Sequence, residues 1–167
     1  MLSEDAQAAH ERTVFTEFAH VAALQIDFST IVSRPKGEPD IRCTLNGVSV
    51  GFELGRILDE GMQNVRNRRR RGEMVSTSSS KKVKVPEREM LKKKLSKRFA
   101  GLVELLLYFD NESFMTGDVP VFGDAEYKRH CEHVMVPLIR AVNPSPYRRY
   151  WVFERHRPSV LWSFSPN

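Results

Sequence analysis

The sequence predicts a fold of α/β or α+β type, in which helices flank a mixed central sheet. Three observations support this class. Apolar residues recur at helical spacing near the N-terminus, alternating and continuous apolar runs follow, and Gly, Pro and Asn separate the runs. The expected order is an αβββαβ core followed by a C-terminal helix and a β-hairpin, within a single domain over residues 1–167.

The N-terminal part is expected to form one helix and three strands. Residues 4–24 place Val14, Phe15 and Phe18 near one face of an amphipathic helix, and residues 25–32 alternate as in a strand. Two further strands are expected over 39–45 and 48–55. Asn46-Gly47 lies between them, and Asn-Gly between apolar residues is the strongest short-range signal for a hairpin.

The rest of the chain is expected to complete the sheet and its helices. A helix is predicted over residues 58–71, a flexible basic and Ser-rich loop over 72–85, and a helix from Pro86 to about Gly101. Residues 102–109 are nearly all apolar, as in a central strand buried on both faces. A helix begins at Asp124 and is kinked or shortened by Pro137, and strands follow over 148–154 and 160–164.

The hairpin places two carboxylates opposite each other. A two-residue turn pairs Leu45 with Val48, so Asp40 faces Glu53 on the side away from the apolar residues. That apolar side carries Pro39, Ile41, Cys43, Leu45, Val48, Val50, Phe52 and Leu54. Facing like charges destabilise a sheet, so a cation, a proton or a neighbouring Arg must offset them. Neutralisation by Arg42 is the simpler interpretation, and a divalent metal site is the alternative.

Positive charge is concentrated directly after the hairpin. Residues 1–55 carry 4 basic and 8 acidic side chains, whereas residues 56–100 carry 15 basic and 5 acidic ones. This asymmetry favours a polyanion held beside an acidic site, although a solvated helix face and a polar linker would have the same composition. The candidates for phosphate contacts are Arg68, Arg69, Arg70, Arg71, Lys81, Lys82, Lys93, Lys94 and Lys97. No aromatic residue lies between Phe52 and Phe99, so contacts to the nucleic-acid backbone are expected rather than base stacking.

Composition excludes several classes of protein. The chain has 41% hydrophobic and 28% charged residues, which is ordinary for a globular protein, and no apolar stretch is long enough to span a membrane. Its N-terminus lacks the basic and apolar pattern of a signal peptide. Cys43 and Cys131 each belong to an apolar face, as expected for buried thiols. A cytoplasmic protein is expected.

Two short motifs carry a resemblance to a known family. Pro39-Asp40 begins the second strand and Glu53-Leu54-Gly55 lies in the third, within an αβββαβ order over residues 5–110. This arrangement resembles the PD-(D/E)XK superfamily of restriction-endonuclease-like nucleases. The resemblance implies a Mg²⁺-dependent phosphodiesterase, with Mn²⁺ as a substitute, in which Asp40 and Glu53 hold the metal and the Leu54 carbonyl is a third ligand. Glu17 in the first helix would add a carboxylate, or stay a solvated helix position.

One position departs from the family pattern. The superfamily has a lysine two residues after the Glu, where this chain has Gly55. One explanation is that another lysine takes its place in space. Lys84 and Lys92 to Lys94 are the nearest basic residues, and Lys84 and Lys92 are the candidates for the catalytic site. Alternatively, the site cleaves weakly without a lysine, or it has lost catalysis.

The leading hypothesis is therefore a metal-dependent, nuclease-like protein that acts on nucleic acid. The alternative is a non-catalytic nucleic-acid-binding or protein-interaction module on the same fold. DNA is favoured over RNA as the nucleic acid, but the sequence does not decide between them. It also leaves open whether the protein forms a homodimer or has a protein partner.

Overall fold

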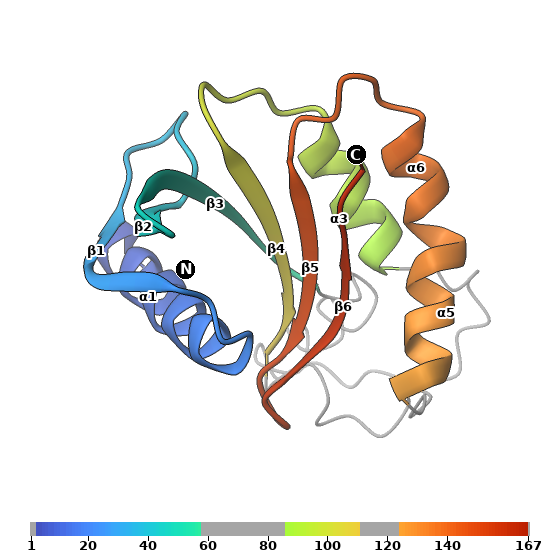
Figure 1. The fold of residues 1–167 in the computed structure, drawn as a ribbon, viewed down its shortest axis with the longest axis horizontal. Helices are drawn as coiled ribbons and strands as arrows, with labels where there is room; N and C mark the ends of the chain where they lie inside the picture. Colours follow the sequence, from blue (N-terminus) through green and yellow to red (C-terminus); the bar gives the residue numbers. More distant parts are fainter. Residues whose placement is uncertain (1–2, 58–85, 111–123, 167) are drawn as a thin grey trace, which may run out of the picture.

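The computed structural model of the protein describes residues 3–57, 86–110 and 124–166 (Figure 1). Its helices are α1 (Glu4–Val21), α3 (Pro86–Leu95), α5 (Asp124–Val134) and α6 (Val136–Arg140). Its strands are β1 (Ile26–Ser33), β2 (Ile41–Leu45), β3 (Val48–Arg56), β4 (Val103–Phe109), β5 (Arg149–Glu154) and β6 (Ser159–Phe164). The predicted helix over 58–71 and the predicted loop over 72–85 lie outside the described residues.

The six strands form one mixed sheet in the order β1-β2-β3-β4-β5-β6. The central strands β3, β4 and β5 run parallel to one another, and the pairs β1–β2, β2–β3 and β5–β6 are antiparallel. All seven residues of β4 are buried, as expected for the central strand of such a sheet. The prediction of an α/β fold with a mixed sheet is confirmed.

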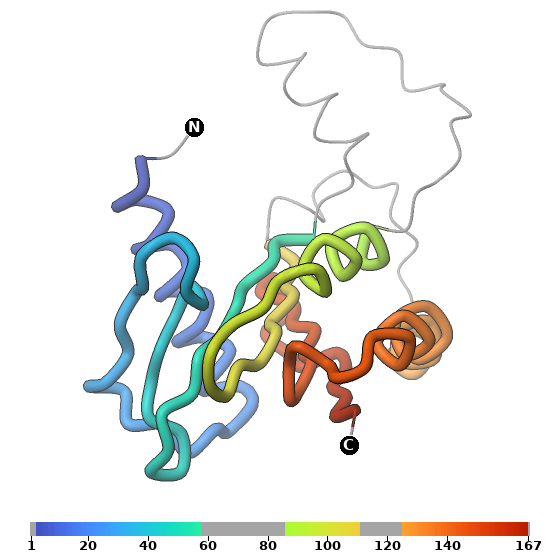
Figure 2. The backbone as a smooth tube through the Cα atoms, turned by 90° about the horizontal axis from the view of Figure 1, so that it is seen from above, coloured from blue at the N-terminus to red at the C-terminus, as the bar shows by residue number. Residues whose placement is uncertain are grey.

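Helices cover both faces of the sheet, so the structure has two hydrophobic cores (Figures 1 and 2). On one face, Phe15 and Phe18 of α1 pack against Phe52 of β3. On the other face, Leu91 of α3 and Met135, at the junction of α5 and α6, belong to a separate buried cluster. Alternate residues of β3 therefore face α1 or α3, and Glu53 lies on the α3 face between the glycines at 51 and 55.

The β2–β3 hairpin has the predicted register. Leu45 pairs with Val48 and Ile41 pairs with Phe52. Asn46 and Gly47 have φ angles of 50° and 76°, as a two-residue type I′ turn requires at both positions. Pro39 differs from the expectation that it shares the apolar face of Ile41. A methyl group added at Gly51 would lie 2.7 Å from Pro39 Cγ, so Pro39 packs over Gly51 on the opposite face.

Two helix boundaries can be compared with the predictions from the sequence. Helix α3 begins at Pro86 as predicted but ends at Leu95 rather than near Gly101. Helix α5 ends at Val134 and α6 begins at Val136. The helical segment is thus interrupted just before Pro137, as expected because proline has no backbone N–H to donate. Within the described residues, no helix is long and apolar enough to cross a membrane.

Candidate functional site at the Asp40–Glu53 pair

Asp40 lies where the hairpin ladder ends. In the register of β2 and β3, Leu54 would be opposite Pro39, which has no N–H to contribute to a ladder. The side chain of Asp40 takes over this place, because its Oδ2 accepts a hydrogen bond of 2.7 Å from the Leu54 N–H. The carbonyl of a strand residue points to the same side as its N–H, so the Leu54 carbonyl also faces the Asp40 edge of β3. The ladder end thus fixes Asp40 beside β3.

Glu53 is a carboxylate inside the protein, with a side chain that is 0% exposed. Its Oε1 atom accepts hydrogen bonds from the Nζ atoms of Lys94 and Lys97, each at 2.5 Å. Its Oε2 atom is also buried, and no described residue gives it a hydrogen bond. A buried carboxylate requires counter-charge and hydrogen bonds. The two ammonium groups supply both to Oε1, whereas Oε2 has no hydrogen bond from a described residue.

Lys94 of α3 reaches Glu53 because it lies on the buried face of the helix. The buried positions are Glu87, Leu91, Lys94 and Leu95, at helical spacing. Only 11% of the Lys94 side chain is exposed. Its backbone carbonyl accepts a 2.9 Å hydrogen bond from the buried Tyr147 hydroxyl, which ties the end of α3 to the segment before β5. The ammonium of Lys94 is therefore held at Glu53 by the packing of the helix.

Gly55 lets α3 pack close to β3, so that an ammonium group of the helix reaches Glu53. A methyl group at position 55 would lie 2.8 Å from Leu107 Cδ2 and 3.1 Å from Met90 Cγ. Met90 belongs to α3, so the helix packs directly over this glycine. A longer side chain at 55 would displace α3, and the close approach of α3 is what brings Lys94 to Glu53.

The charges of Glu53 and Lys94 affect the pKa values of neighbouring groups. Burial, and after it the nearby charge of Glu53, raise the pKa of Asp40 to about 6, against the opposing effects of the Leu54 N–H and of Lys94. The pKa of Tyr147 is also raised, first by burial and then by the charge of Glu53. The pKa of Asp40 is therefore closer to neutral pH than that of an ordinary Asp, as is often found for functional carboxylates.

The residues proposed to neutralise or extend the pair lie elsewhere. Arg42 donates to Ser49 Oγ at 3.3 Å, so the ammonium groups of α3 and the following turn, rather than Arg42, compensate the carboxylates. Glu17 is not beside the pair, because both of its oxygens accept hydrogen bonds from Arg155 at 2.7 and 2.8 Å. The α1 carboxylate whose charge reaches Asp40 is Glu11.

The basic residues predicted to act in catalysis or to contact phosphates lie in different places in the structure. Lys92, expected as a catalytic residue, is exposed and has its Nζ 3.9 Å from Glu89 Oε1, whereas Lys94 and Lys97, expected to contact phosphates, lie at Glu53. Lys93 is exposed on α3. The remaining candidates, Arg68, Arg69, Arg70, Arg71, Lys81, Lys82 and Lys84, lie outside the described residues. Among the described candidates, Lys94 and Lys97 are the ones that the structure places at the carboxylate pair.

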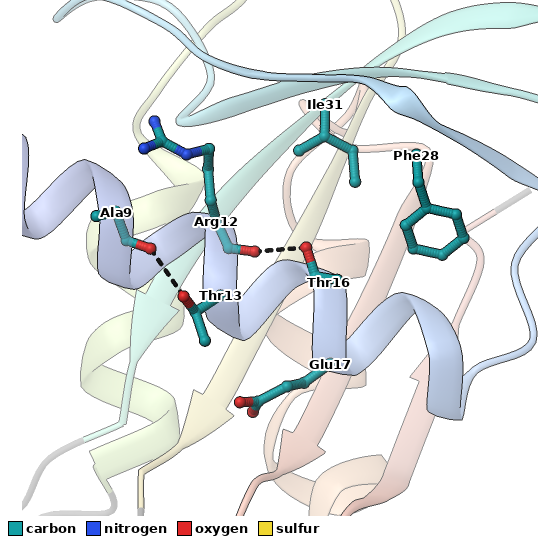
Figure 3. A pocket seen from close by; sticks show the side chains of 7 residues that line it. All are labelled: Ala9, Arg12, Thr13, Thr16, Glu17, Phe28 and Ile31. Atoms are coloured by element: carbon teal, nitrogen blue, oxygen red, sulfur yellow. Dashed lines mark hydrogen bonds between the residues drawn. The ribbon is translucent and has the colours of Figure 1, made fainter.

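A hollow of about 560 Å³ lies between α1 and β1, away from the carboxylate pair (Figure 3). Its polar residues already have partners: the hydroxyls of Thr13 and Thr16 donate to the carbonyls one turn earlier in α1, and Arg12 donates to Ser33 Oγ. A ligand site needs a few convergent polar groups. The Asp40–Glu53 pair is therefore the better candidate for a ligand site, because Oε2 of Glu53 is buried and accepts no hydrogen bond from a described residue.

A cation at the pair would have few protein ligands. The available oxygens are those of Asp40, Oε2 of Glu53 and the Leu54 carbonyl, and the described residues contain no group of three or more His, Cys, Asp or Glu side chains able to hold a metal ion. Tyr147 and Glu11 complete the surroundings and were not predicted from the sequence. Comparisons with family models, curated proteins and solved structures gave no match.

Proposed function

We propose that this protein is a metal-dependent phosphodiesterase of the nuclease type, related to the PD-(D/E)XK superfamily. The observation that carries the proposal is the contact of Lys94 with Glu53 beside Asp40. It places two carboxylates and an ammonium group within one site on adjacent strands and the helix over them. The superfamily has a lysine where this chain has Gly55, and Lys94 of α3 would replace it. This corresponds to the first of the three explanations given for Gly55.

The donor set fits a magnesium ion. Mg²⁺ commonly takes one or two carboxylates and completes its octahedron with waters and phosphate oxygens, so it does not need a cage of protein ligands. The open Oε2 of Glu53 and the ionised form of Asp40 suit that role, with the Leu54 carbonyl at the same edge of β3. When bound, the metal would lower the pKa of a coordinated water and neutralise charge on the phosphate.

The residues of the chain would then have separate tasks. Asp40 and Glu53 hold the cation, and Lys94 supplies positive charge at the reacting phosphate in a site from which water is largely excluded. In hydrolysis, the water oxygen would form a new bond to phosphorus while the bond from phosphorus to the leaving ester oxygen breaks, and the attacking water would lose a proton to solvent while the leaving oxygen takes one up from solvent. The exposed Lys93 and Arg98 offer further positive charge beside the site for the rest of a polyanionic chain.

A second function has its own observation. The ammonium groups of Lys94 and Lys97 already compensate Glu53 without a metal ion, and this arrangement suits a non-catalytic nucleic-acid-binding or protein-interaction module. Such a module would bind nucleic acid without Mg²⁺ and would leave it intact.

Cleavage assays separate the two functions. Labelled DNA and RNA are incubated with the protein in Mg²⁺ or Mn²⁺, beside Asp40→Asn, Lys94→Met and the control Lys128→Met, which changes an exposed lysine of α5. A phosphodiesterase is expected to lose at least about 100-fold in rate in the first two variants and little in the control. Cleavage that survives in both site variants would overturn the assignment, and binding without cleavage by the unmodified protein would favour the module.

A further inference from the structure

Resting on the proposed function, we propose that Lys97 is an exchangeable partner of Glu53. In the cation-free site Lys97 neutralises Glu53. When a divalent cation binds at the carboxylates, Lys97 leaves Glu53 and contacts a phosphate group of the bound nucleic acid. Lys97 is thus a substrate-positioning residue, whereas Lys94 stays at the carboxylate throughout.

The two lysines differ in how firmly they are held. The Lys94 side chain is 11% exposed and lies on the buried stripe of α3, whose last turn is tied down by Tyr147. The Lys97 side chain is 42% exposed and follows the end of the helix. Returning an ammonium to solvent costs little when its side chain is already half exposed, whereas moving a buried one breaks packing. Lys97 is therefore the lysine that can leave.

Lys97 also has other groups within reach. Its Nζ lies 5.9 Å from the centroid of the Phe99 ring, a distance at which an aromatic face still attracts a cation. Lys94 and Lys97 contact Oε1 of Glu53 separately, so the contact of Lys94 does not depend on that of Lys97. Departure of Lys97 therefore removes one partner of Glu53 and leaves the Lys94 contact with the pair in place.

The balance of charge favours such an exchange. Asp40, Glu53, Lys94 and Lys97 together carry two formal negative and two formal positive charges when all are ionised. A divalent cation adds two positive charges to this balanced group. Repulsion at Glu53 then favours release of the less buried ammonium, and the phosphates of a nucleic acid supply the negative charge that it next meets.

Binding of Mn²⁺ to the full chain tests the first half of the proposal without any need for activity. Free Mn²⁺ is measured by its electron paramagnetic resonance signal for the unmodified protein, Lys97→Met, Lys97→Gln and the matched control Lys93→Met. The control removes an exposed lysine of α3 and thus corrects for the loss of one positive charge. We expect both Lys97 variants to bind Mn²⁺ about threefold to tenfold more tightly than Lys93→Met does.

Equal Mn²⁺ affinity in the Lys97 and Lys93 variants would overturn this inference and leave the cation site of the proposed function intact. Absence of Mn²⁺ binding in all of them, with Asp40→Asn as the reference for an inactivated site, would overturn both proposals. The two failures are thus distinguishable.

The salt dependence of DNA binding tests the second half. The affinity for a short duplex is measured against salt concentration with and without Ca²⁺, chosen as a divalent cation with oxygen ligands. For the unmodified protein, the cation is expected to steepen the slope of log K against log salt by about 0.9, the effect of one added phosphate contact. Lys97→Met should lack this increment. An equal increment in both proteins would remove Lys97 from the phosphate contacts.

Discussion

Two groups of paired charges lie on opposite faces of the sheet, and they use their carboxylates differently. On the α1 face, both oxygens of Glu17 accept hydrogen bonds from Arg155, which also donates to Asp110 at 3.1 Å. On the α3 face, two ammonium groups converge on one oxygen of Glu53. The first group joins α1 to the ends of β4 and β5. In the second group, Oε2 of Glu53 is buried and accepts no hydrogen bond from a described residue.

The difference follows from the cations. A guanidinium is a planar fork that matches both oxygens of a carboxylate, so the Arg155 group is closed and suited to holding elements together. An ammonium is a point charge on a flexible stem, and two of them at one oxygen leave the other free to take a new ligand. We conclude that the α1-face group is structural and that the α3-face group is suited to exchange ligands.

The largest expected effect comes from removing Glu53. Glu53→Ala leaves the ammonium of Lys94 inside the protein without its carboxylate, and the free energy of unfolding is expected to fall by about 3–5 kcal/mol. Glu17→Ala, on the other face, is expected to cost about 1 kcal/mol because the Glu17 side chain is 41% exposed. Urea unfolding at neutral pH measures both values.

The double variant Glu53→Ala with Lys94→Met serves as the control for this comparison. Removing the lysine as well eliminates the uncompensated charge, so part of the lost stability is expected to return. A cost of Glu53→Ala no greater than that of Glu17→Ala would show that the two faces do not differ in the way proposed.

An intermediate effect is expected at Asp40 and depends on pH. The raised pKa of Asp40, about 6 against 3.8 for an ordinary Asp, means that the folded protein binds this proton more tightly than the unfolded chain does. Its contribution to stability is therefore greatest below about pH 4 and is lost as the pH rises through 6. Asp40→Asn keeps an acceptor for the Leu54 N–H and removes the charge.

We therefore expect Asp40→Asn to stabilise the protein more at pH 7.5 than at pH 5, by about 1 kcal/mol after allowance for partial exposure. Urea unfolding at the two pH values measures the difference. Asp27→Asn, which changes an exposed carboxylate that also accepts a backbone N–H, controls for the loss of one negative charge. A gain that is the same at both pH values would contradict the raised pKa.

The carboxylate half of the site was predictable because its signals are local. Asn46-Gly47 fixes the register of β2 and β3, and register alone brings Asp40 opposite Glu53. The order of helices and strands along the chain and the interruption of the helix before Pro137 were predictable for the same reason, since each depends on residues close in sequence. The side of the hairpin on which Pro39 lies was not, because the chain leaves the ladder there.

The cationic half was not predictable from local signals. Lys94 is separated from Glu53 by 41 positions, and their contact depends on how α3 packs over Gly55 through Met90. One signal in the sequence was available: Lys94 lies three residues after Leu91 and next to Leu95, on the apolar stripe rather than on the solvated face. The position of Glu17 was missed because Arg155 is 138 positions away.

The smallest expected effect distinguishes the two faces by salt. Glu17→Gln keeps the size of the side chain but removes its charge, and the partner Arg155 still has Asp110, so a cost of about 0.5–1 kcal/mol is expected at low salt. At roughly 1 M salt the cost should become smaller, because a half-exposed pair is screened over a few ångströms. Glu53→Gln is expected to cost the same at both salt concentrations, since its carboxylate is fully buried. If instead the salt dependence were larger at Glu53, water and ions would already reach that carboxylate in the folded state, and the ammonium groups would not need to move for a cation to enter.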